Sequence, residues 1–594
     1  MAHTRTAPAG TPLGDSFHLY DTTLRDGAQR EGISYSVTDK LASARLLDSL
    51  GVGFIEGGWP GALPKDTAFF QRAASELDLR HAALVAFGST RKAGRRAERD
   101  PQVRALLDSG APVITLVAKT DRRHIERALR TDVAENCAMV RDTVRFLAAE
   151  GRRVFLDGEH FFDGYADDPD TALRVLDAAM EAGADVAVLC DTNGGRLPGR
   201  LADVVAEVIE RTAFRIGIHC QDDTGCAVAN TIAAVEAGAT HVQCTANGYG
   251  ERAGNADLFA VIGNLTTKLD LPVLPPTRLT ELAGTAQALA ETAHVVPDRH
   301  QPYVGAAAFA HKAGLHASAM KVDPGLYQHI DPDVVGNTSR ILVTEMAGRA
   351  SLELKCLQLG FDTKDADTKG TEAFSRVVAR VKELEAGGWS FESADASLAL
   401  LLHEELAATA TRPVATATGP ADSAGGHRAP RLPGGFTPLT YQVVERHTAD
   451  GTVVCEASVR LRAEHLADAS GTRALDAGAF AAEGAGDVIA TSEGQDPVRA
   501  LDAALRRALV PRLPWVVETA LVDSSVRVLD SAPGAPALTR VLVVSRAAER
   551  EWTTVGVHAS AAVAAMLALG DALAYKPLGD TLSRAGTRAP VPTR

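Results

Sequence analysis

The stretch "FHLYDTTLRDG", residues 17–27, is a short apolar run that ends in polar and charged residues. An Ala- and Leu-rich segment, "VTDKLASARLLDSLG" (37–51), follows it and carries apolar residues at helical spacing. The pair predicts a strand that delivers polar side chains to its carboxyl end, and then a helix. Repetition of this strand and helix unit determines the predicted architecture.

Seven further runs of the same kind follow along the chain. They are "GFIEGGWP" (53–60), "AALVAFGST" (82–90), "VITLVAKT" (113–120), "RVFLDGEH" (153–160), "VAVLCDTNGG" (186–195), "RIGIHCQDD" (215–223) and "HVQCTANGYGE" (241–251). Alternating strands and helices predict parallel strands, and eight units in about 250 residues have the size of a (β/α)8 TIM barrel. An open doubly wound sheet is the alternative, but the first strand-to-helix turn lacks a G-x-G-x-x-G motif.

Polar residues gather at the carboxyl ends of these predicted strands. They are Arg25, Asp26, Glu56, Lys119, Glu159, His160, Asp191, Thr192, His219, Gln221 and Asn247, which we call the rim residues. In a barrel this end carries the chemistry. Any single Asp or Thr among them is explained equally well as a helix cap, but eight strands that converge on one polar face indicate an active site.

The rest of the chain divides by composition. We expect the barrel over 17–275, helical linker subdomains over 276–405 with an extended polar segment at 327–337, and a flexible linker rich in Ala, Thr, Pro and Gly over 406–434. Two β-β-α-like units over 435–580 predict a pseudo-symmetric α+β domain. Between the two units, residues from about 463 to 490 resemble neither of them and form an insertion.

Composition narrows the class of protein. The chain has 594 residues, 46% of them apolar and 23% charged, and a formal charge of −14, so no basic surface is set aside for nucleic acid or an anionic membrane. Seven scattered cysteines without a C-x-x-C pair are typical of a reduced compartment. No apolar run approaches the roughly 20 residues of a membrane span. We expect a cytoplasmic protein.

Two short motifs point to chemistry. Arg25 and Asp26 end the first strand. Arginine can donate two parallel hydrogen bonds to a carboxylate, and aspartate can bind a divalent cation. An isolated Arg-Asp dipeptide, however, more often forms a local salt bridge. His219 and Gln221 are two residues apart, so on a strand they face the same way. Such a pair often holds a metal ion, yet the second position is an amide rather than a second imidazole.

Several longer strings together resemble a known family. "YDTTLRDGAQ", H-x-x-D-D-T-G and "NGYGERAGNAD" look like the acyl-CoA-condensing branch of the DRE-TIM metallolyases, which comprises 2-isopropylmalate, homocitrate and citramalate synthases. "IEGGWPGALPKD", "DGEHFFDGY" and "CDTNGG" look most like the citramalate synthase group. The chain after residue 435 resembles the regulatory and dimerisation domain of these synthases.

The resemblance implies a Claisen-type condensation catalysed by an acyltransferase. The methyl group of acetyl-CoA loses a proton and attacks the keto carbon of pyruvate, and hydrolysis releases CoA and citramalate for isoleucine biosynthesis. The alternative is the same chemistry on 2-oxoisovalerate for leucine biosynthesis, because pocket size alone separates the two and a methyl group is worth only ~1 kcal/mol. A retro-aldol lyase is a third reading, but its loop cysteine is missing from "NGYGERAGN".

The resemblance also implies roles for individual residues. Metal ligands would be Asp26, His219 and Asn255, with Gln221 in the fourth position. The oxoacid would be held by Arg25, Thr192 and Asp26, with Arg25 facing developing oxyanion charge. Proton transfers would fall to Glu159, His316 and Tyr327, with His311 as the nearest competitor of His316. In relatives the segment with this histidine reaches into the partner subunit, which implies a homodimer with shared sites.

One position departs from the family pattern. Relatives have H-x-H-N-D where this chain has H-C-Q-D-D, so Gln221 and Asp222 differ. Either metal binding is lost and the barrel is an inactive effector-binding scaffold, or the amide oxygen of Gln221 coordinates directly or through water. We expect the second, because the rest of the rim is intact. Affinity would fall, and Mg²⁺ or Mn²⁺ would be favoured over Zn²⁺ or Co²⁺.

The C-terminal domain carries the remaining expectation. The resemblance implies allosteric regulation of branched-chain amino-acid biosynthesis by an amino-acid effector, isoleucine or, as the alternative, leucine. No individual residue identifies the effector. The insertion at about 463–490 falls inside this domain.

Overall fold

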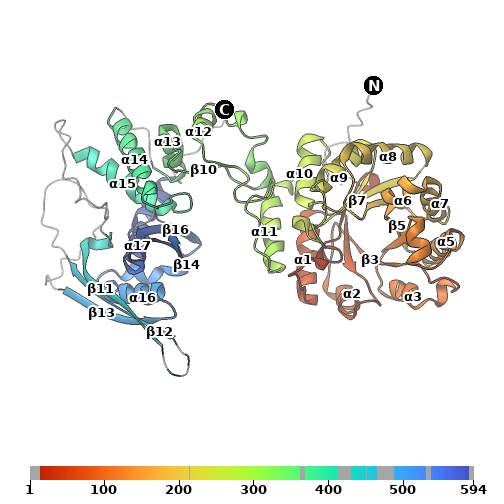
Figure 1. Cartoon of the computed structure of the whole chain (residues 1–594), viewed down its shortest axis with the longest axis horizontal. Coiled ribbons are helices and arrows are strands. Elements are labelled where there is room, and N and C mark those ends of the chain that lie inside the picture. Colours follow the sequence, from red (N-terminus) through yellow and green to blue (C-terminus); the bar gives the residue numbers. More distant parts are fainter. Residues whose placement is uncertain are drawn as a thin grey trace. The chain divides into compact units, whose positions relative to one another are not determined.

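The computed structural model describes residues 14–212, 214–361, 368–411, 430–447, 449, 451, 453–463, 487–529 and 537–586. The chain folds into two compact units (Figure 1). The first contains residues up to Phe309 together with Gln328–Ser339, and the second contains Ala310–Tyr327 and the residues from Arg340 onward. Each unit is therefore described separately.

The first unit is a closed barrel of eight parallel strands in chain order. The strands are β1 (His18–Asp21), β2 (Phe54–Gly58), β3 (Ala83–Ser89), β4 (Val113–Lys119), β5 (Arg153–Glu159), β6 (Val186–Asp191), β7 (Arg215–Cys220) and β8 (His241–Cys244). Parallel pairing of β1 with β8 closes the ring. The predicted TIM barrel is confirmed, and the open-sheet alternative is wrong.

Helices follow the strands and surround the barrel (Figure 1). They are α1 (Val37–Leu50), α2 (Pro64–Glu76), α3 (Pro101–Asp108), α4 (Arg122–Arg127), α5 (Val133–Ala149), α6 (Phe161–Asp167), α7 (Pro169–Met180), α8 (Pro198–Arg211), α9 (Ala227–Glu236), α10 (Leu258–Lys268) and α11 (Leu282–Thr292). Local sequence sets their ends. Ser36 and Asp39 form a capping box at the start of α1, and Gly51, at φ 101°, ends it in the left-handed conformation that glycine adopts without strain.

Side chains that alternate along the strands form layers inside the barrel. Phe155, Asp157 and Glu159 are spaced by two along β5, so they face the same side and rise from an apolar layer to a polar one. Tyr20 and Phe155 belong to a buried aromatic and aliphatic cluster that fills the lower barrel. This filled core supports the polar side chains at the carboxyl ends of the strands.

The second unit begins with helices. They are α12 (Gly314–Val322), α13 (Arg349–Gln358), α14 (Thr368–Ala386) and α15 (Asp395–Thr411), beside a two-stranded sheet of β9 (Ala310–His311) and β10 (Arg340–Ile341). The segment 327–337, which we expected to be extended, contains the 3-10 helix η7 (Pro332–Val335), and so that expectation is wrong there. The predicted linker begins inside α15, and its residues 412–429 lie outside the described part.

Two similar halves complete the second unit. The first has strands β11 (Phe436–His447), β12 (Val453–Ala463) and β13 (Asp487–Gly494) and helix α16 (Pro497–Leu509). The second has β14 (Ala520–Leu529), β15 (Leu538–Ala547), β16 (Arg550–His558) and helix α17 (Ala561–Gly586). Each half has three antiparallel strands rather than two. In the first half the third strand, β13, begins inside the predicted insertion at about 463–490, whose residues 464–486 lie outside the described part.

Helix α17 is the only helix among the described residues that is long and apolar enough to cross a membrane. It is a core helix: Ala564, Met566, Ala568 and Leu569 are buried in the cluster that the two halves share. Its apolar character is therefore explained by packing.

Candidate active site

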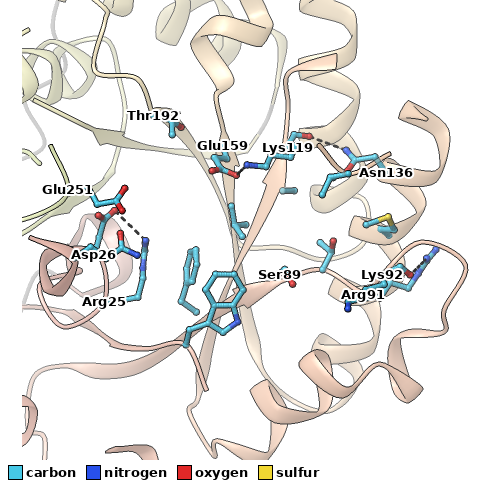
Figure 2. Close-up of a pocket in the computed structure, with 18 of the residues that line it drawn as sticks. Arg25, Asp26, Ser89, Arg91, Lys92, Lys119, Asn136, Glu159, Thr192 and Glu251 are labelled. Carbon is cyan, nitrogen blue, oxygen red and sulfur yellow. Dashed lines mark hydrogen bonds and ion pairs between the residues drawn. The ribbon is translucent and has the colours of Figure 1, made fainter. Parts of the chain in front are cut away.

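A cavity of about 770 Å³ opens at the carboxyl ends of the barrel strands (Figure 2). Arg25, Asp26, Glu159, Thr192 and Gln221 all line it, so the structure brings together residues from β1, β5, β6 and β7 and the loops that follow them. A smaller cavity of about 90 Å³ lies among the same residues and is lined in addition by Asp157, Cys190 and His219.

Arg25 is held in a fixed orientation. Its Nε donates to Glu56 Oε2 at 2.6 Å, its Nη1 donates to Asp26 Oδ2 at 3.3 Å, and its Cζ lies 3.8 Å from the centroid of the Phe87 ring. Glu56 is fully buried and accepts a further hydrogen bond from Tyr20 Oη at 2.5 Å. Two of the five N–H donors of the guanidinium are thus used, and the others remain for a ligand.

Asp26 and His219 face each other across the floor of the cavity, with Asp26 Oδ2 3.3 Å from His219 Nε2. Burial acts to raise the pKa of Asp26, but the charges of Arg25 and His219 hold it well below its usual range. Burial acts to lower the pKa of His219, and the hydrogen bond to Asp26 more than offsets this and raises it. Both pKa shifts favour a negative charge on Asp26 beside a positive charge at His219.

Two amide oxygens complete the arrangement. Gln221 Oε1 and Asn255 Oδ1 are buried and have no hydrogen-bond partner in the described structure. Gln221 Nε2 donates to Asp26 Oδ2 at 3.5 Å, Asn255 Nδ2 donates to the Tyr249 carbonyl at 2.9 Å, and a β-bridge joins Gln221 to Asn255. Buried oxygens are rarely left unpaired. One carboxylate, one imidazole and two amide oxygens fit a divalent cation.

Thr192 and Glu159 occupy the opposite side of the site. The backbone N–H of His160 donates to Thr192 Oγ1 at 2.8 Å, and His160 adopts a left-handed conformation with φ 60°. Glu159 forms an ion pair with Lys119, its neighbour in register on β4 (Figure 2). The sequence placed Lys119 on the rim but gave it no role.

Three other polar residues of this face have structural roles. Asp191 accepts from the N–H groups of Gly195 and Arg196, so it caps the turn after β6. Asn247 donates to the Ala286 carbonyl at 3.1 Å. Asp222, which departs from the family pattern, accepts from the N–H of Ala227 at 2.8 Å at the start of α9.

Sequence reasoning missed two buried residues of the site. Gln243 Oε1 lies 2.7 Å from His219 Nδ1, and Gln243 Nε2 donates to Asp157 Oδ1 at 2.9 Å. Burial, and after it the charge of Glu56, raises the pKa of Asp157 to about 7. The available signal was strand register: Asp157 is two residues before Glu159, and Gln243 pairs with His219 between β7 and β8.

His316 and Tyr327 belong to the second unit. Their rings stack with centroids 4.1 Å apart, and the ring of His311 lies 6.3 Å from that of His316. The two residues that the resemblance links to proton transfer therefore contact each other. Their role in the reaction stays a prediction.

A second cluster in the barrel has the residue types of a metal site. Ligand atoms of Asp15, His18 and Asp185 lie within 4.8 Å of one another at the amino-terminal ends of the strands. Arg153 donates to Asp15 at 2.6 Å and forms an ion pair with Asp185, and Arg215 donates to the Asp15 carbonyl. Because two guanidinium groups already neutralise these acids, this cluster is an ion-pair network rather than a cation site.

The chain matches three protein-family descriptions. Residues 16–289 match an HMGL-like domain, residues 303–386 match a homocitrate synthase post-HMGL domain-like region, and residues 440–576 match a LeuA allosteric (dimerisation) domain. The order of the three agrees with the barrel, the helical region and the paired α+β halves. The resemblance drawn from the sequence motifs is confirmed.

Individual relatives extend over nearly the whole chain. An (R)-citramalate synthase from Streptomyces coelicolor is 53% identical over 567 residues, which cover 96% of this chain and 98% of that protein. An (R)-citramalate synthase from Synechocystis sp. is 41% identical and covers 94% of this chain and 96% of its own. Among solved structures, an HMG-CoA lyase from Bacillus subtilis is 19% identical, covers 49% of this chain and 98% of its own, and has a TM-score of 0.41. By these full-length identities, the chain belongs to the family of the (R)-citramalate synthases.

Proposed function

We propose that this enzyme condenses acetyl-CoA with pyruvate to give (R)-citramalate and CoA, in the cytoplasmic synthesis of isoleucine. The observation that carries the proposal is the small cavity of about 90 Å³ in which Arg25, Thr192, Glu159 and the Asp26–His219 pair meet. It combines a carboxylate-binding arginine, a cation site and a candidate base around a space for a small oxoacid.

The cation site takes a divalent metal ion. Asp26, His219, Asn255 and Gln221 would hold it, and the amide oxygens favour Mg²⁺ or Mn²⁺ over Zn²⁺ or Co²⁺. When bound, a divalent cation supplies Lewis acidity toward the keto oxygen of the substrate. The unpaired oxygens of Gln221 and Asn255 support this assignment.

Arg25 and Thr192 orient the oxoacid. Arg25 keeps a planar fork of N–H groups for the pyruvate carboxylate and for negative charge that develops on the keto oxygen. Thr192 Oγ1 accepts from the His160 N–H, so its own hydrogen is free to donate to a substrate oxygen. The stacking of Arg25 on Phe87 and its bond to Glu56 reduce the entropy lost when it binds substrate.

Glu159, His316 and Tyr327 are assigned to proton transfer. Glu159 lines the small cavity and forms an ion pair with Lys119, and this position suits its carboxyl group to the role of general base. His316 and Tyr327 lie among exposed apolar side chains, since Leu315 is 75%, Val322 82% and Leu326 59% exposed. An exposed apolar surface of this kind is typical of an interface, which supports a homodimer in which each subunit completes the partner's site.

Mixed dimers test the shared site. A Glu159→Ala subunit paired with a His316→Ala subunit regains one intact site if the two residues come from different protomers, and activity returns. Homodimers of either variant are the control, and both should be inactive. An inactive mixed dimer, with its composition verified by two different affinity tags, would contradict sharing between subunits.

Oxoacid size is tested directly. Phe87 and Val117 line the small cavity, and 2-oxoisovalerate carries two more carbon atoms than pyruvate. We expect release of free CoA with pyruvate and at least tenfold lower kcat/KM with 2-oxoisovalerate. A preference for 2-oxoisovalerate would assign 2-isopropylmalate synthase activity instead. No turnover of any oxoacid with Mg²⁺, Mn²⁺, Co²⁺ or Zn²⁺ would support an inactive scaffold.

The C-terminal domain supplies the regulatory site of the proposal. A cavity of about 390 Å³ lies where α16 and α17 begin and is lined by Val443, Asp496, Pro497, Val498, Ser524, Val526, Ala561, Ala562 and Ala565. Asp496 already caps the N-terminus of α16, because it accepts from the N–H groups of Val498 and Arg499, so the N-terminus of α17 remains to bind a carboxylate. The valine and alanine side chains suit an aliphatic amino acid. Isoleucine, with leucine as the alternative, is the proposed effector. Rates that do not change with either amino acid would contradict this.

A further inference from the structure

We propose that Gln243 and Asp157 are positioning residues that fix His219 in the tautomer with its proton on Nδ1, so that Nε2 presents a lone pair to the cation site. The inference deepens the proposed function, since it rests on the cation site beside Asp26. Asp157 also lines the small cavity, but the proposed mechanism assigns neither residue a bond to the substrate or the cation.

The donor and acceptor roles follow from the contacts. Gln243 Oε1, 2.7 Å from His219 Nδ1, is an amide oxygen and only accepts, so Nδ1 carries the proton. Gln243 Nε2 donates to Asp157 Oδ1 at 2.9 Å. All three side chains are buried, with 5%, 1% and 3% of His219, Gln243 and Asp157 exposed, so water does not compete for these bonds.

Asp157 determines which way the amide of Gln243 points. A reversed amide would place Oε1 against Asp157 Oδ1, which brings two acceptors together when Asp157 is ionised. It would also direct the NH₂ group at His219 Nδ1. That nitrogen would then have to accept, and the proton would move to Nε2, where it would block a metal ion. The carboxyl group of Asp157 therefore selects the orientation that leaves Nε2 open.

The second ring nitrogen of His219, Nε2, faces the proposed cation site. Nε2 faces Asp26 Oδ2 at 3.3 Å. A lone pair and a carboxylate at this distance are stable together only with a positive charge between them, either a proton on Nε2 or a metal ion. Metal-bound histidines characteristically donate their other N–H to an oxygen acceptor, which sets the tautomer and raises ligand basicity.

This chain depends on such support more than a site with two imidazoles. Position 221, two residues along the same strand end, is glutamine, so His219 is the only imidazole among the proposed ligands. An amide oxygen is the weaker ligand. A wrong tautomer or orientation of His219 would therefore weaken the one nitrogen ligand proposed for this site.

The experiment measures Mn²⁺ affinity by isothermal titration calorimetry on the full-length, metal-stripped protein. Gln243→Met and Asp157→Leu keep side-chain length but remove the hydrogen bonds, and we expect a 10- to 100-fold higher Kd in each. Asp157→Asn keeps an oxygen acceptor and should stay within about threefold to fivefold of the parent, as a conservative rescue. Thr115→Val, which removes a buried hydroxyl bonded to Tyr20 instead, is the matched control and should leave the Kd unchanged.

Equal Kd values for Gln243→Met, Asp157→Leu and Thr115→Val would overturn the proposal and leave these residues as polar core packing. A second measurement is made on the parent protein and does not require Gln243→Met or Asp157→Leu to fold. In the parent protein labelled with ¹⁵N-histidine, with His219→Gln used for assignment, Nδ1 of His219 should carry the proton when Zn²⁺ is bound. A proton on Nε2 there would refute the tautomer, whereas failure of the proposed reaction would leave this result standing.

Discussion

The two ends of the barrel contain the same kinds of residue but differ in what these residues leave unsatisfied. At the amino-terminal end, Arg153 and Arg215 neutralise Asp15 and Asp185, and Arg215 also contacts His18. Burial lowers the pKa of His18 to about 4. At the carboxyl end the pKa of His219 is raised instead, and two amide oxygens nearby have no partner in the described structure.

The comparison teaches that residue types alone do not make a cation site. Both ends offer aspartate and histidine within contact distance, and the amino-terminal cluster even has three potential ligand atoms within 4.8 Å of one another. The carboxyl end is distinguished by a negative group and buried oxygens that still need a positive partner. The cost of leaving such groups unpaired is of the order of 1–3 kcal/mol each, which a bound cation removes.

A substitution confined to the carboxyl end of the barrel should reduce activity most. Asp26→Asn removes a charged ligand and should lower kcat about a thousandfold, because electrostatic stabilisation at a metal site contributes several kcal/mol. Asp15→Asn at the amino-terminal end should leave kcat within about twofold. The measurement is CoA release from acetyl-CoA and pyruvate. Comparable losses in both variants would show that the ends are not functionally distinct.

Replacing arginine by lysine sharpens the same contrast. Arg25→Lys loses the planar fork and its stacking on Phe87, and we expect a drop in kcat/KM of about a hundredfold. Arg153→Lys keeps a cation between Asp15 and Asp185, and it should lower the melting temperature slightly without a kinetic effect. Steady-state kinetics and thermal melts on both variants decide. An active Arg25→Lys enzyme would argue against oxoacid binding by this residue.

A second imidazole at position 221 should change the metal preference of the site and leave the fold unchanged. Gln221→His should lower the Kd for Zn²⁺ by about 10- to 100-fold and move the metal preference from Mg²⁺ or Mn²⁺ toward Zn²⁺. Metal content after dialysis against equal concentrations of the ions measures the shift. An unchanged preference would mean that residue 221 does not contact the cation.

The smallest effect is on stability and depends on pH. The pKa of Asp157 is raised from 3.8 to about 7, so the folded state binds its proton more tightly than the unfolded state does. This group therefore costs stability increasingly as pH rises from about 4 to 7, and the cost is full above that range. Asp157→Asn should stabilise the metal-free protein more at pH 8 than at pH 5, by on the order of 1–3 kcal/mol. A pH-independent difference in melting temperature would contradict the shift.

The barrel and much of its site could be predicted because strand ends are visible in a sequence. Arg25, Asp26, Thr192 and His219 follow apolar runs, and parallel strands bring such residues to one face. Asp157 and Gln243 were missed because they lie inside the strands, where a buried polar residue looks like an interruption until its cross-strand neighbour is known. Strand β13 was missed because its first residues were assigned to the predicted insertion, and its pairing with β12 cannot be read from the sequence.

The left-handed backbone at His160 has a consequence for protein engineering. Its N–H group holds the Thr192 hydroxyl only while φ stays positive, near 60°. Glycine and asparagine tolerate that conformation, but valine or isoleucine would strain it. Libraries that aim at new oxoacid substrates should therefore leave residue 160 nearly fixed and place their diversity at Val117, which lines the small cavity from a regular strand and does not support Arg25 as Phe87 does.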